Sequence, residues 1–334
     1  MKKVVIYLLI IIDIMICMFL FFTYGPIDYF RNLLVTTAMT TKSHHYLAKT
    51  LYSEETIYEI MDSNYMEEVN ENTNLTEINI GNIEEKTEYD SIYEEQILKR
   101  DKDAVYKIIP LSGNTYKGYL VAVYDPSRIE LVTSRYLGKR GETVQEMAKR
   151  EDALIAINAG GFADAGGVGN GGIPTGSLIQ DSNLIYQGPD TGWGGGIVGF
   201  TKDNILMLYK GTANDAIEQG IEDAVEFGPF LIVNGKRSIA KGNGGYGISS
   251  RTAIGQRQDG IVLFVVIDGR QPGYSLGINM SELTDIFVRY RAYNAVNLDG
   301  GASSSLVENK KLISKPCAYS ATGERWIASA WIVK

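Results

Sequence analysis

The sequence predicts an α+β protein with a mixed β-sheet core, a strand–helix–strand unit and flanking helices, preceded by one N-terminal transmembrane helix. Residues Val4–Phe22 form an almost unbroken apolar stretch, close to the roughly 20 residues that a spanning helix needs. From Val105 onward, short apolar runs alternate with turn signals, a pattern typical of strands. Two apolar runs, Ile261–Ile267 and Ala295–Leu298, flank a segment with helical periodicity.

The strand–helix–strand unit predicts where polar side chains gather. Its helix is expected to begin at Ser281, a good N-cap residue, and its two strands are expected to be parallel because the connection between them is long. Asp268 and Asp299 would then leave the sheet side by side, each followed by Gly, at an edge where α/β proteins commonly bind ligands. Arg251 and Arg270 could converge on the same polar cleft. The alternative is that both Asp-Gly pairs are only turns.

Other local signals predict individual elements. Tyr119–Tyr124 and Ile129–Thr133 flank Asp125-Pro126, which indicates a hairpin. Thr143 and Glu146 have the spacing of a capping box at the start of a helix. The Asn234-Gly235 pair after an apolar run predicts a second hairpin.

The N-terminal apolar stretch predicts a single-pass membrane protein. Lys2 and Lys3 precede it, so the N-terminus should stay in the cytoplasm and the rest should be exported. Asp13 interrupts the stretch, and the many Ile, Leu and Phe residues around it can offset its cost. A cleaved signal peptide is the alternative. The long apolar stretch and the lack of a small-x-small site before Tyr24 favour an uncleaved anchor.

Composition divides the chain into three parts. Residues 1–23 are expected to form the cytoplasmic end and the anchor. Residues 24–100 combine a juxtamembrane helical segment, with helix expected around Ser53–Met61, and an acidic linker over 67–95 that is poor in apolar pattern. The domain that carries the function is expected over 101–334.

Charge, cysteine and histidine content exclude several classes of function. The net charge of -8 argues against general binding of nucleic acid. Cys17 and Cys317 are too far apart in the chain for an internal disulfide to be expected. The only histidines are His44 and His45, which are either a metal or pH-sensing site or simply two polar residues on a juxtamembrane helix. The main domain therefore has no histidine for a catalytic triad, and any metal there would need oxygen ligands, which suit calcium or magnesium.

A glycine-rich segment, Gly166–Gly176, contains a GxGxxG pattern, but it leads into Ile173-Pro174 and not into a helix. We therefore expect a loop that covers a polar ligand and not a dinucleotide site. Trp193, which lies among glycines, is either a face for stacking on a sugar or a core tryptophan.

Six motifs appear in a fixed order: INAGGF, IPTG, EFGPFLIVNG, RTAIG, VIDGR and NLDGGASSS. Together they resemble the phosphodiester glycosidase family, which includes the lysosomal-targeting "uncovering enzyme" and bacterial membrane-anchored proteins once called exopolysaccharide biosynthesis proteins. The resemblance covers about Lys107–Lys334 and extends to the juxtamembrane segment. Two positions depart from the usual pattern: Ala159 stands in the first motif, and Ala302 replaces a glycine in the last.

The resemblance implies hydrolysis of a sugar-1-phosphodiester, in a cell-envelope or extracellular glycopolymer, between the anomeric carbon and the phosphate oxygen. Such chemistry needs cations for the phosphate and a carboxylate beside the anomeric carbon. The expected catalytic residues are Asp299, Asp268, Glu226 and Arg251. The expected substrate-binding residues are Asn158, Gly160, Gly161, Trp193, Arg270, Asn297, Gly300, Gly301, Ser303 and Ser304.

Two other functions stay open at this point. One is a carbohydrate-binding or exopolysaccharide-assembly protein without turnover. The other is a calcium- or magnesium-dependent phosphodiesterase in which Asp268 and Asp299 hold the metal, although the dense His and Asp cluster usual in such enzymes is absent.

Overall fold

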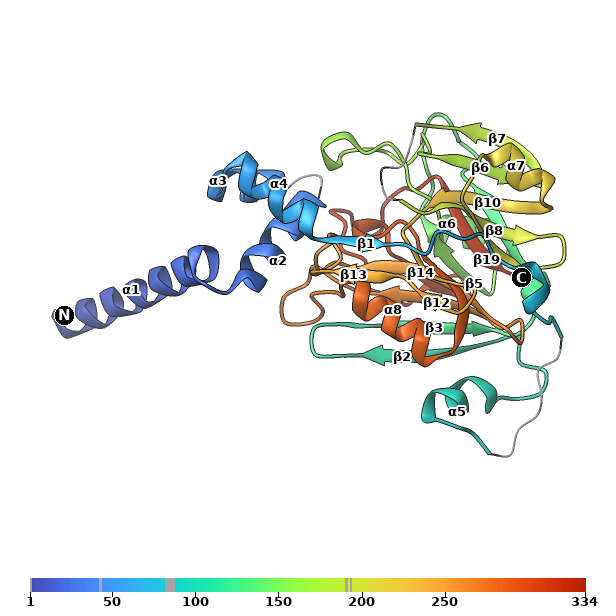
Figure 1. The fold of residues 1–334 in the computed structure, drawn as a ribbon, viewed down its shortest axis with the longest axis horizontal. Coiled ribbons are helices and arrows are strands. Elements are labelled where there is room, and N and C mark those ends of the chain that lie inside the picture. Colours follow the sequence, from blue (N-terminus) through green and yellow to red (C-terminus); the bar gives the residue numbers. More distant parts are fainter. Residues whose placement is uncertain (1, 42–43, 82–87, 190–191, 193) are drawn as a thin grey trace.

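Three β-sheets surround a common apolar core, and helices cover their outer faces (Figure 1). The structure is a computed structural model that describes residues 2–41, 44–81, 88–189, 192 and 194–334. The sheets have seven, five and five strands, and a two-stranded sheet joins the N-terminal segment to the domain. This architecture confirms the α+β class predicted from the sequence.

The α-helices lie at the N-terminal end of the described chain and between the strands. They are α1 (Lys2–Tyr24), α2 (Asp28–Met39), α3 (His45–Leu51), α4 (Glu54–Ser63), α5 (Ile92–Leu98), α6 (Val144–Arg150), α7 (Ala213–Glu218) and α8 (Met280–Arg289). The strands are β1 (Tyr65–Glu67), β2 (Tyr106–Ser112), β3 (Lys117–Val123), β4 (Ile129–Thr133), β5 (Ile155–Asn158), β6 (Ser177–Gln180), β7 (Asn183–Gln187), β8 (Gly196–Thr201), β9 (Leu206–Tyr209), β10 (Ile221–Phe227), β11 (Phe230–Val233), β12 (Lys236–Arg237), β13 (Ile239–Lys241), β14 (Arg251–Arg257), β15 (Val262–Ile267), β16 (Ala292–Asn297), β17 (Leu306–Glu308), β18 (Lys311–Leu312) and β19 (Ser329–Val333).

The seven-stranded sheet has the order β12-β11-β16-β14-β15-β3-β2. The strand–helix–strand unit β15-α8-β16 is present, and its two strands run in the same direction because β14 is antiparallel to both. The expectation that they lie side by side is wrong, since β14 lies between them. The reason is local: the RTAIG segment forms its own strand and pairs as a hairpin with the apolar run that follows it, with Arg251 opposite Ile267.

Local signals at element ends are confirmed in part. The Thr143–Glu146 capping box begins α6, and β11 and β12 form the hairpin predicted at Asn234-Gly235. Helix α8 begins two residues earlier than predicted, because Asn279 and Glu282 form a capping box that leaves Ser281 inside the helix. The hairpin predicted around Asp125-Pro126 is wrong: β3 pairs with β2, and β4 pairs with β19 in another sheet.

The apolar core lies between the inner faces of the three large sheets. Its largest side chain, Trp331 on β19, is fully buried and packs edge-on against Phe200 with 5.4 Å between ring centroids. Smaller apolar clusters lie under the covering helices: α8 packs on the outer face of the seven-stranded sheet, α6 on β5, and α7 on β10. The sheets therefore fix the ends of their strands, where the polar motifs lie.

Helix α1 stands away from the domain (Figure 1). It is 23 residues long, its side chains are almost all exposed, and its length and composition would allow it to cross a membrane. An exposed apolar surface of this size is typical of a membrane span or a signal sequence.

The segment between α1 and the domain contacts the domain at several places. Helices α2, α3 and α4 share a small apolar cluster, and β1 pairs with β13. The Glu68 carboxylate accepts hydrogen bonds from the backbone N–H of Gly195 and of Phe230, each at 3.0 Å. The domain boundary predicted near Asp101 stays a prediction.

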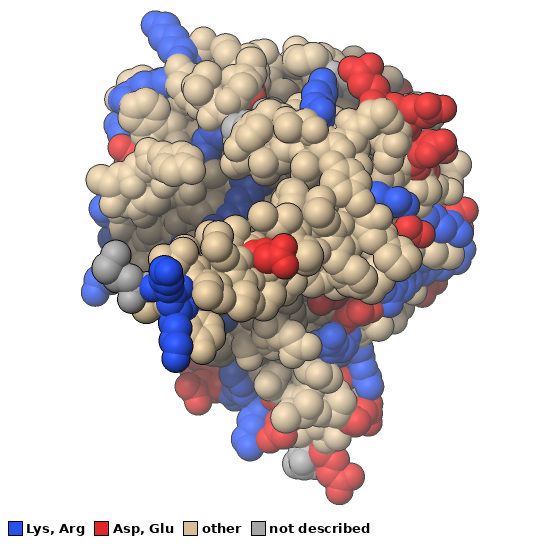
Figure 2. Space-filling view, turned by 90° about the vertical axis from the view of Figure 1, so that its left-hand side faces the viewer, with Lys and Arg blue, Asp and Glu red and all other residues tan. Residues whose placement is uncertain are grey.

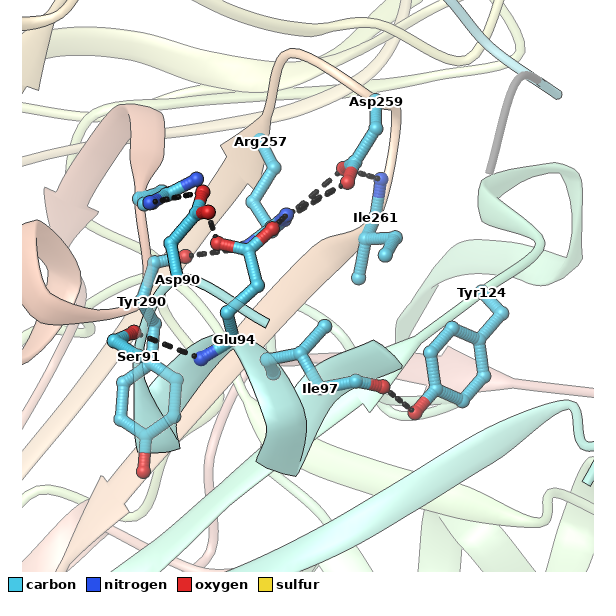
Figure 3. A network of polar contacts seen from close by, with 10 residues as sticks. Asp90, Ser91, Glu94, Ile97, Tyr124, Arg257, Asp259, Ile261 and Tyr290 are labelled. Carbon is cyan, nitrogen blue, oxygen red and sulfur yellow. Dashed lines mark hydrogen bonds and ion pairs between the residues drawn. The ribbon is translucent and has the colours of Figure 1, made fainter. Parts of the chain in front are cut away.

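Helix α5 is fixed to the domain by a buried ion-pair network (Figure 3). The Glu94 carboxylate is buried and pairs with Arg291 at 2.7 Å and with Arg257 at 3.5 Å; Arg257 also binds Asp259 at 2.8 Å. Beside this network the Tyr124 hydroxyl donates a hydrogen bond to the carbonyl of Ile97, whose side chain is fully buried. Both charge and apolar packing therefore hold this acidic segment in place.

Candidate active site

A cleft of about 1080 Å³ opens at the sheet edge where the polar motifs lie. The edge combines the start of β14, the end of β15 and the end of β16, because β14 runs antiparallel to the other two. Of the residues predicted from the sequence, those that line the cleft are Gly161, Arg251, Arg270, Asn297, Asp299, Gly300, Gly301 and Ser303. Neighbouring strands thus bring together two arginines, a carboxylate and an amide from motifs about 50 residues apart.

Two arginines give the cleft its positive charge. Arg251 is 7% exposed, and its guanidinium donates to the backbone carbonyls of Tyr246 and Gly247 at 2.6 and 3.0 Å. Burial, and next the neighbouring Arg270, lower the pKa of Arg251 to about 9, which leaves it a cation at neutral pH. Arg270 donates to the hydroxyls of Ser249 at 3.0 Å and Thr41 at 3.5 Å. Two neighbouring cations held by neutral groups suit a dianionic or diester phosphate.

Asp299 is held in the cleft by the backbone around it. It follows β16, and its carbonyl accepts a hydrogen bond from the side chain of Asn158 at 2.6 Å. Asn158 also accepts from the Thr252 hydroxyl and from the backbone N–H of Ser305, so it fixes three segments at once. One oxygen of the Asp299 carboxylate accepts from the backbone N–H of Gly300 at 3.0 Å. The half-buried carboxylate lines the cleft. Burial lowers the pKa of Arg270, and the nearby Asp299 carboxylate partly opposes that shift.

Gly301 allows the turn after Asp299 to pass under Arg270. Its φ is +61°, and Ser250 holds it from both sides, accepting from its N–H at 2.9 Å and donating to its carbonyl at 2.7 Å. A Cβ atom built on Gly301 would lie 2.9 Å from a guanidinium nitrogen of Arg270.

Gly301→Ala should therefore lower kcat/KM by about tenfold, equivalent to about 1.4 kcal/mol, because the methyl group displaces Arg270. Gly273→Ala is the matched control: Gly273 has φ +83° and no atom within 4 Å of an added Cβ, so it carries similar backbone strain without the contact. The measurement is steady-state kinetics together with melting temperature. Equal kinetic losses in the two variants would contradict a role for the Gly301–Arg270 contact.

Asn297 offers an acceptor at the floor of the cleft. Its side-chain N–H donates to the carbonyl of Gly228 at 2.8 Å, and its side-chain oxygen, in a residue 3% exposed, has no hydrogen-bond partner among the described residues. Leaving a buried acceptor unpaired costs about 1–3 kcal/mol. A sugar hydroxyl that enters the cleft could satisfy this oxygen.

Five of the described residues that were predicted for the site do not line the cleft, and hydrogen bonds explain two of these absences. Asp268 is buried, and its two oxygens accept from the Tyr274 hydroxyl at 2.9 Å and from the backbone N–H of Lys315 at 2.8 Å. Burial raises the pKa of Asp268. Glu226 accepts from the N–H and hydroxyl of Ser177. Its neighbour Phe227 lines the cleft, and adjacent strand residues face opposite sides.

Gly160 and Ser304 are buried behind the cleft wall, as is Asn158. Trp193 lies outside the described residues. The catalytic and binding roles expected for these residues stay predictions.

The cleft also contains residues that the sequence did not predict for this site. Arg325 forms a two-pronged ion pair with Asp164 at 2.6 and 2.8 Å, which raises the pKa of Arg325. Thr41 and His44 reach the cleft from the juxtamembrane segment. The polar pair His44-His45 was the one signal that could have pointed there. Nothing local marks Arg325, which is brought in from a segment near the C-terminus.

Glu324 is a further carboxyl group in the cleft wall. It is 3% exposed and accepts a hydrogen bond from the backbone N–H of Gln145 at 3.2 Å. Burial, the largest cause, raises its pKa above the ordinary value of 4.5. The ionised form of Glu324 is therefore disfavoured in the folded protein. The neutral group contributes to the free energy of unfolding below pH 4.5, and this contribution is lost as the pH rises through the raised pKa.

Glu324→Gln should consequently raise the melting temperature by roughly a few degrees at pH 8 and leave it unchanged at pH 4, because Gln keeps the acceptor without the charge. Thermal unfolding of the full chain at the two pH values is the measurement. Identical shifts at both values would show that ionisation of Glu324 carries no cost.

The acidic side chains that the structure describes do not gather into a site for the calcium or magnesium ion left open by the sequence. Both carboxylate oxygens of Asp268 accept hydrogen bonds from the protein, and Asp268 does not line the cleft with Asp299. Within the part of the chain that the structure describes, no group of three or more His, Cys, Asp or Glu residues gathers around one point. Because these ions prefer six or more oxygen ligands, the residues present do not fit such a site.

Comparison with known proteins identifies the class. The sequence model of the phosphodiester glycosidase family matches residues 151–334, more than half of the chain. The chain belongs to this family, as the motifs predicted.

Curated relatives match over part of their length. The SPbeta prophage-derived uncharacterized protein YomE of Bacillus subtilis is 30% identical over 220 residues, which cover 63% of this chain and 33% of that protein. N-acetylglucosamine-1-phosphodiester α-N-acetylglucosaminidase from Bos taurus is 26% identical over 204 residues, which cover 53% of this chain and 35% of that enzyme. The chain thus spans about a third of the length of these relatives.

Solved structures share the fold. The catalytic domain of zebrafish N-acetylglucosamine-1-phosphodiester α-N-acetylglucosaminidase, auto-inhibited by its pro-peptide, matches with a TM-score of 0.56 and 22% identity over 70% of this chain and 85% of that one. A hypothetical protein from Synechocystis matches with a TM-score of 0.50 and 16% identity over 69% and 61%.

Proposed function

We propose that this protein hydrolyses a sugar-1-phosphodiester between the anomeric carbon and the bridging phosphate oxygen. The observation that carries the proposal is that the Asp299 carboxylate and the cations Arg251 and Arg270 line one cleft at one sheet edge. The relatives named for N-acetylglucosamine-1-phosphodiester support N-acetylglucosamine as the sugar.

The cations and the carboxylate of the cleft have different roles in the proposed reaction. Arg251 and Arg270 bind the phosphate and stabilise the charge that grows on the leaving phosphomonoester, which therefore needs little protonation. Asp299 stabilises the positive charge that develops at the anomeric carbon and either attacks it or activates water. Asn297 accepts a hydrogen bond from a sugar hydroxyl.

Overall, the C–O bond breaks, the phosphomonoester keeps the bridging oxygen, and water supplies the new hydroxyl of the sugar and a proton. The glycopolymer substrate predicted from the sequence is one form that such a diester can take, and a lipid-linked ester is another.

Product analysis tests the proposal. The full chain is incubated with N-acetylglucosamine-1-phosphate esters of several alcohols, with and without a chelator, and the products are separated. We expect free N-acetylglucosamine plus a phosphomonoester, at rates that the chelator does not change. Sugar phosphate plus alcohol, with activity lost to chelator, would instead identify a metal-dependent phosphodiesterase. Binding without turnover would identify a carbohydrate-binding protein.

For the location of the protein, α1 serves as an uncleaved anchor, with Lys2 and Lys3 in the cytoplasm and the domain outside. A tag placed after Lys334 should be digested when protease is added to intact cells. Protection of that tag, in cells whose surface proteins are digested, contradicts this topology.

A further inference from the structure

The juxtamembrane segment forms part of the cleft wall. Thr40, Thr41 and His44 line the cleft beside the arginines. Thr41 accepts a hydrogen bond from Arg270 at 3.5 Å, and the Thr40 hydroxyl donates to the carbonyl of Tyr246 at 3.3 Å. The cleft is therefore built from both the domain and the segment that leaves the anchor.

Helix α3 links this wall to the end of α1. Its first residue follows His44, and its last residue, Leu51, accepts a hydrogen bond from the Tyr24 hydroxyl at 2.9 Å. The next residue, Tyr52, donates to the carbonyl of Thr23 at 2.8 Å. Seven helical residues extend about 10 Å at 1.5 Å per residue. The cleft wall thus lies about 10 Å from the end of the apolar helix, a distance comparable to the polar layer of a bilayer.

The cleft opens on the side from which α1 projects. Figure 2 views the molecule from that side and shows a hollow with basic side chains in its depth, bordered mainly by uncharged ones. A substrate that lies in the membrane around α1 would meet this opening directly.

The rim of the cleft carries exposed apolar and aromatic side chains. Val168, Tyr319 and Trp326 line the cleft and are 86%, 108% and 45% exposed. The guanidinium of Arg140 lies 5.4 Å from the centre of the Trp326 ring. Single exposed apolar residues are ordinary, but Trp, Tyr and Arg together beside a membrane anchor are typical of groups that settle at the bilayer interface.

We infer that the cleft takes a sugar-1-phosphate diester whose second ester is a membrane lipid. This inference rests on the proposed function and specifies its substrate class. The sugar enters the cleft, and the phosphate contacts Arg251 and Arg270. The lipid chain crosses the rim formed by Val168, Tyr319 and Trp326 and continues into the bilayer. The products are a free sugar and a lipid phosphomonoester that stays in the membrane.

The test uses the full chain in vesicles of phosphatidylethanolamine and phosphatidylglycerol. Two substrates are compared: N-acetylglucosamine-1-phosphate esterified to a polyprenol in the same vesicles, and the methyl ester in solution. We expect kcat/KM to be at least about tenfold higher for the polyprenyl ester. Trp326→Ser and Tyr319→Ser should each lower the ratio of the two values by about fivefold. Val288→Ser is the matched control, since Val288 on α8 is 46% exposed and does not line the cleft.

Each outcome decides a different point. Equal kcat/KM for the two esters, or a faster methyl ester, overturns the inference and leaves the proposed function standing. If Val288→Ser reduces the lipid preference as much as Trp326→Ser does, the assignment of the rim is wrong. No hydrolysis of either ester contradicts the proposed function and the inference together.

Discussion

Asp299→Asn should lower turnover by at least about a hundredfold while the protein remains folded. Asn has almost the same shape and can still accept the hydrogen bond from the Gly300 N–H, so the turn after β16 should persist. It cannot carry the negative charge that stabilises an oxocarbenium-like transition state, nor act as nucleophile or base. Effects of general acid–base groups of 10²–10⁴ set the scale.

Three variants serve as comparisons for Asp299→Asn. Glu226→Gln should keep turnover within a few-fold, because the Glu226 carboxylate bonds to Ser177 outside the cleft. Asp268→Asn should mainly lower the melting temperature, because Asp268 joins Tyr274 to the Lys315 backbone. Arg251→Lys keeps charge but loses the planar guanidinium, so it should act largely through KM. Near-normal turnover in Asp299→Asn, with loss in Glu226→Gln, would reverse the roles of the two carboxylates.

Removal of residues 1–100 should destabilise the domain by several kcal/mol or prevent its folding. The truncation removes the buried Glu94 carboxylate, which pairs with Arg257 and Arg291, while Arg257 keeps its ion pair with Asp259. It also removes the fully buried Ile97 side chain, and deletion of a buried Ile side chain costs about 2–5 kcal/mol. The Tyr124 hydroxyl loses its hydrogen-bond acceptor, the carbonyl of Ile97. The boundary predicted from composition near Asp101 implies the opposite result.

A chain that begins at Asp28 is the control, since it lacks α1 but keeps α2 to α5. Circular dichroism and thermal unfolding of the two chains, purified in the same buffer, provide the measurement. We expect a cooperative transition for the longer chain and none, or one at much lower temperature, for the chain that begins at Asp101. Equal melting temperatures would establish the boundary near Asp101 and show that the contacts of residues 64–98 contribute little.

The part of the site that the sequence predicted comes from motifs at strand ends. Asn297 ends a buried strand, Asp299 follows it, and Arg251 begins another. Any sheet that pairs these two strands in antiparallel order therefore brings the three residues to one edge. Sequence periodicity could not show that β14 separates β15 from β16, because the order of strands depends on tertiary pairing. For the same reason it could not show that Asp268 turns toward Tyr274, out of the cleft.

The missed residues come from distant segments without a pattern of their own. Arg325 reaches the cleft only because its ion pair with Asp164 joins two segments 161 positions apart. Thr41 and His44 arrive through the packing of α2, α3 and α4 on the domain, in a region where composition indicated a juxtamembrane helix and a linker. Long-range contacts of this kind leave no local signal in the chain.

The position of the broken bond tests the central claim most directly. The full chain is allowed to hydrolyse an N-acetylglucosamine-1-phosphodiester in water enriched in oxygen-18, and the phosphomonoester is examined by phosphorus NMR and mass spectrometry. Attack at the anomeric carbon places the water oxygen on the sugar, so we predict a phosphomonoester without the label. One labelled oxygen in the phosphomonoester would mean attack at phosphorus and would contradict the glycosidase mechanism built on Asp299, Arg251 and Arg270.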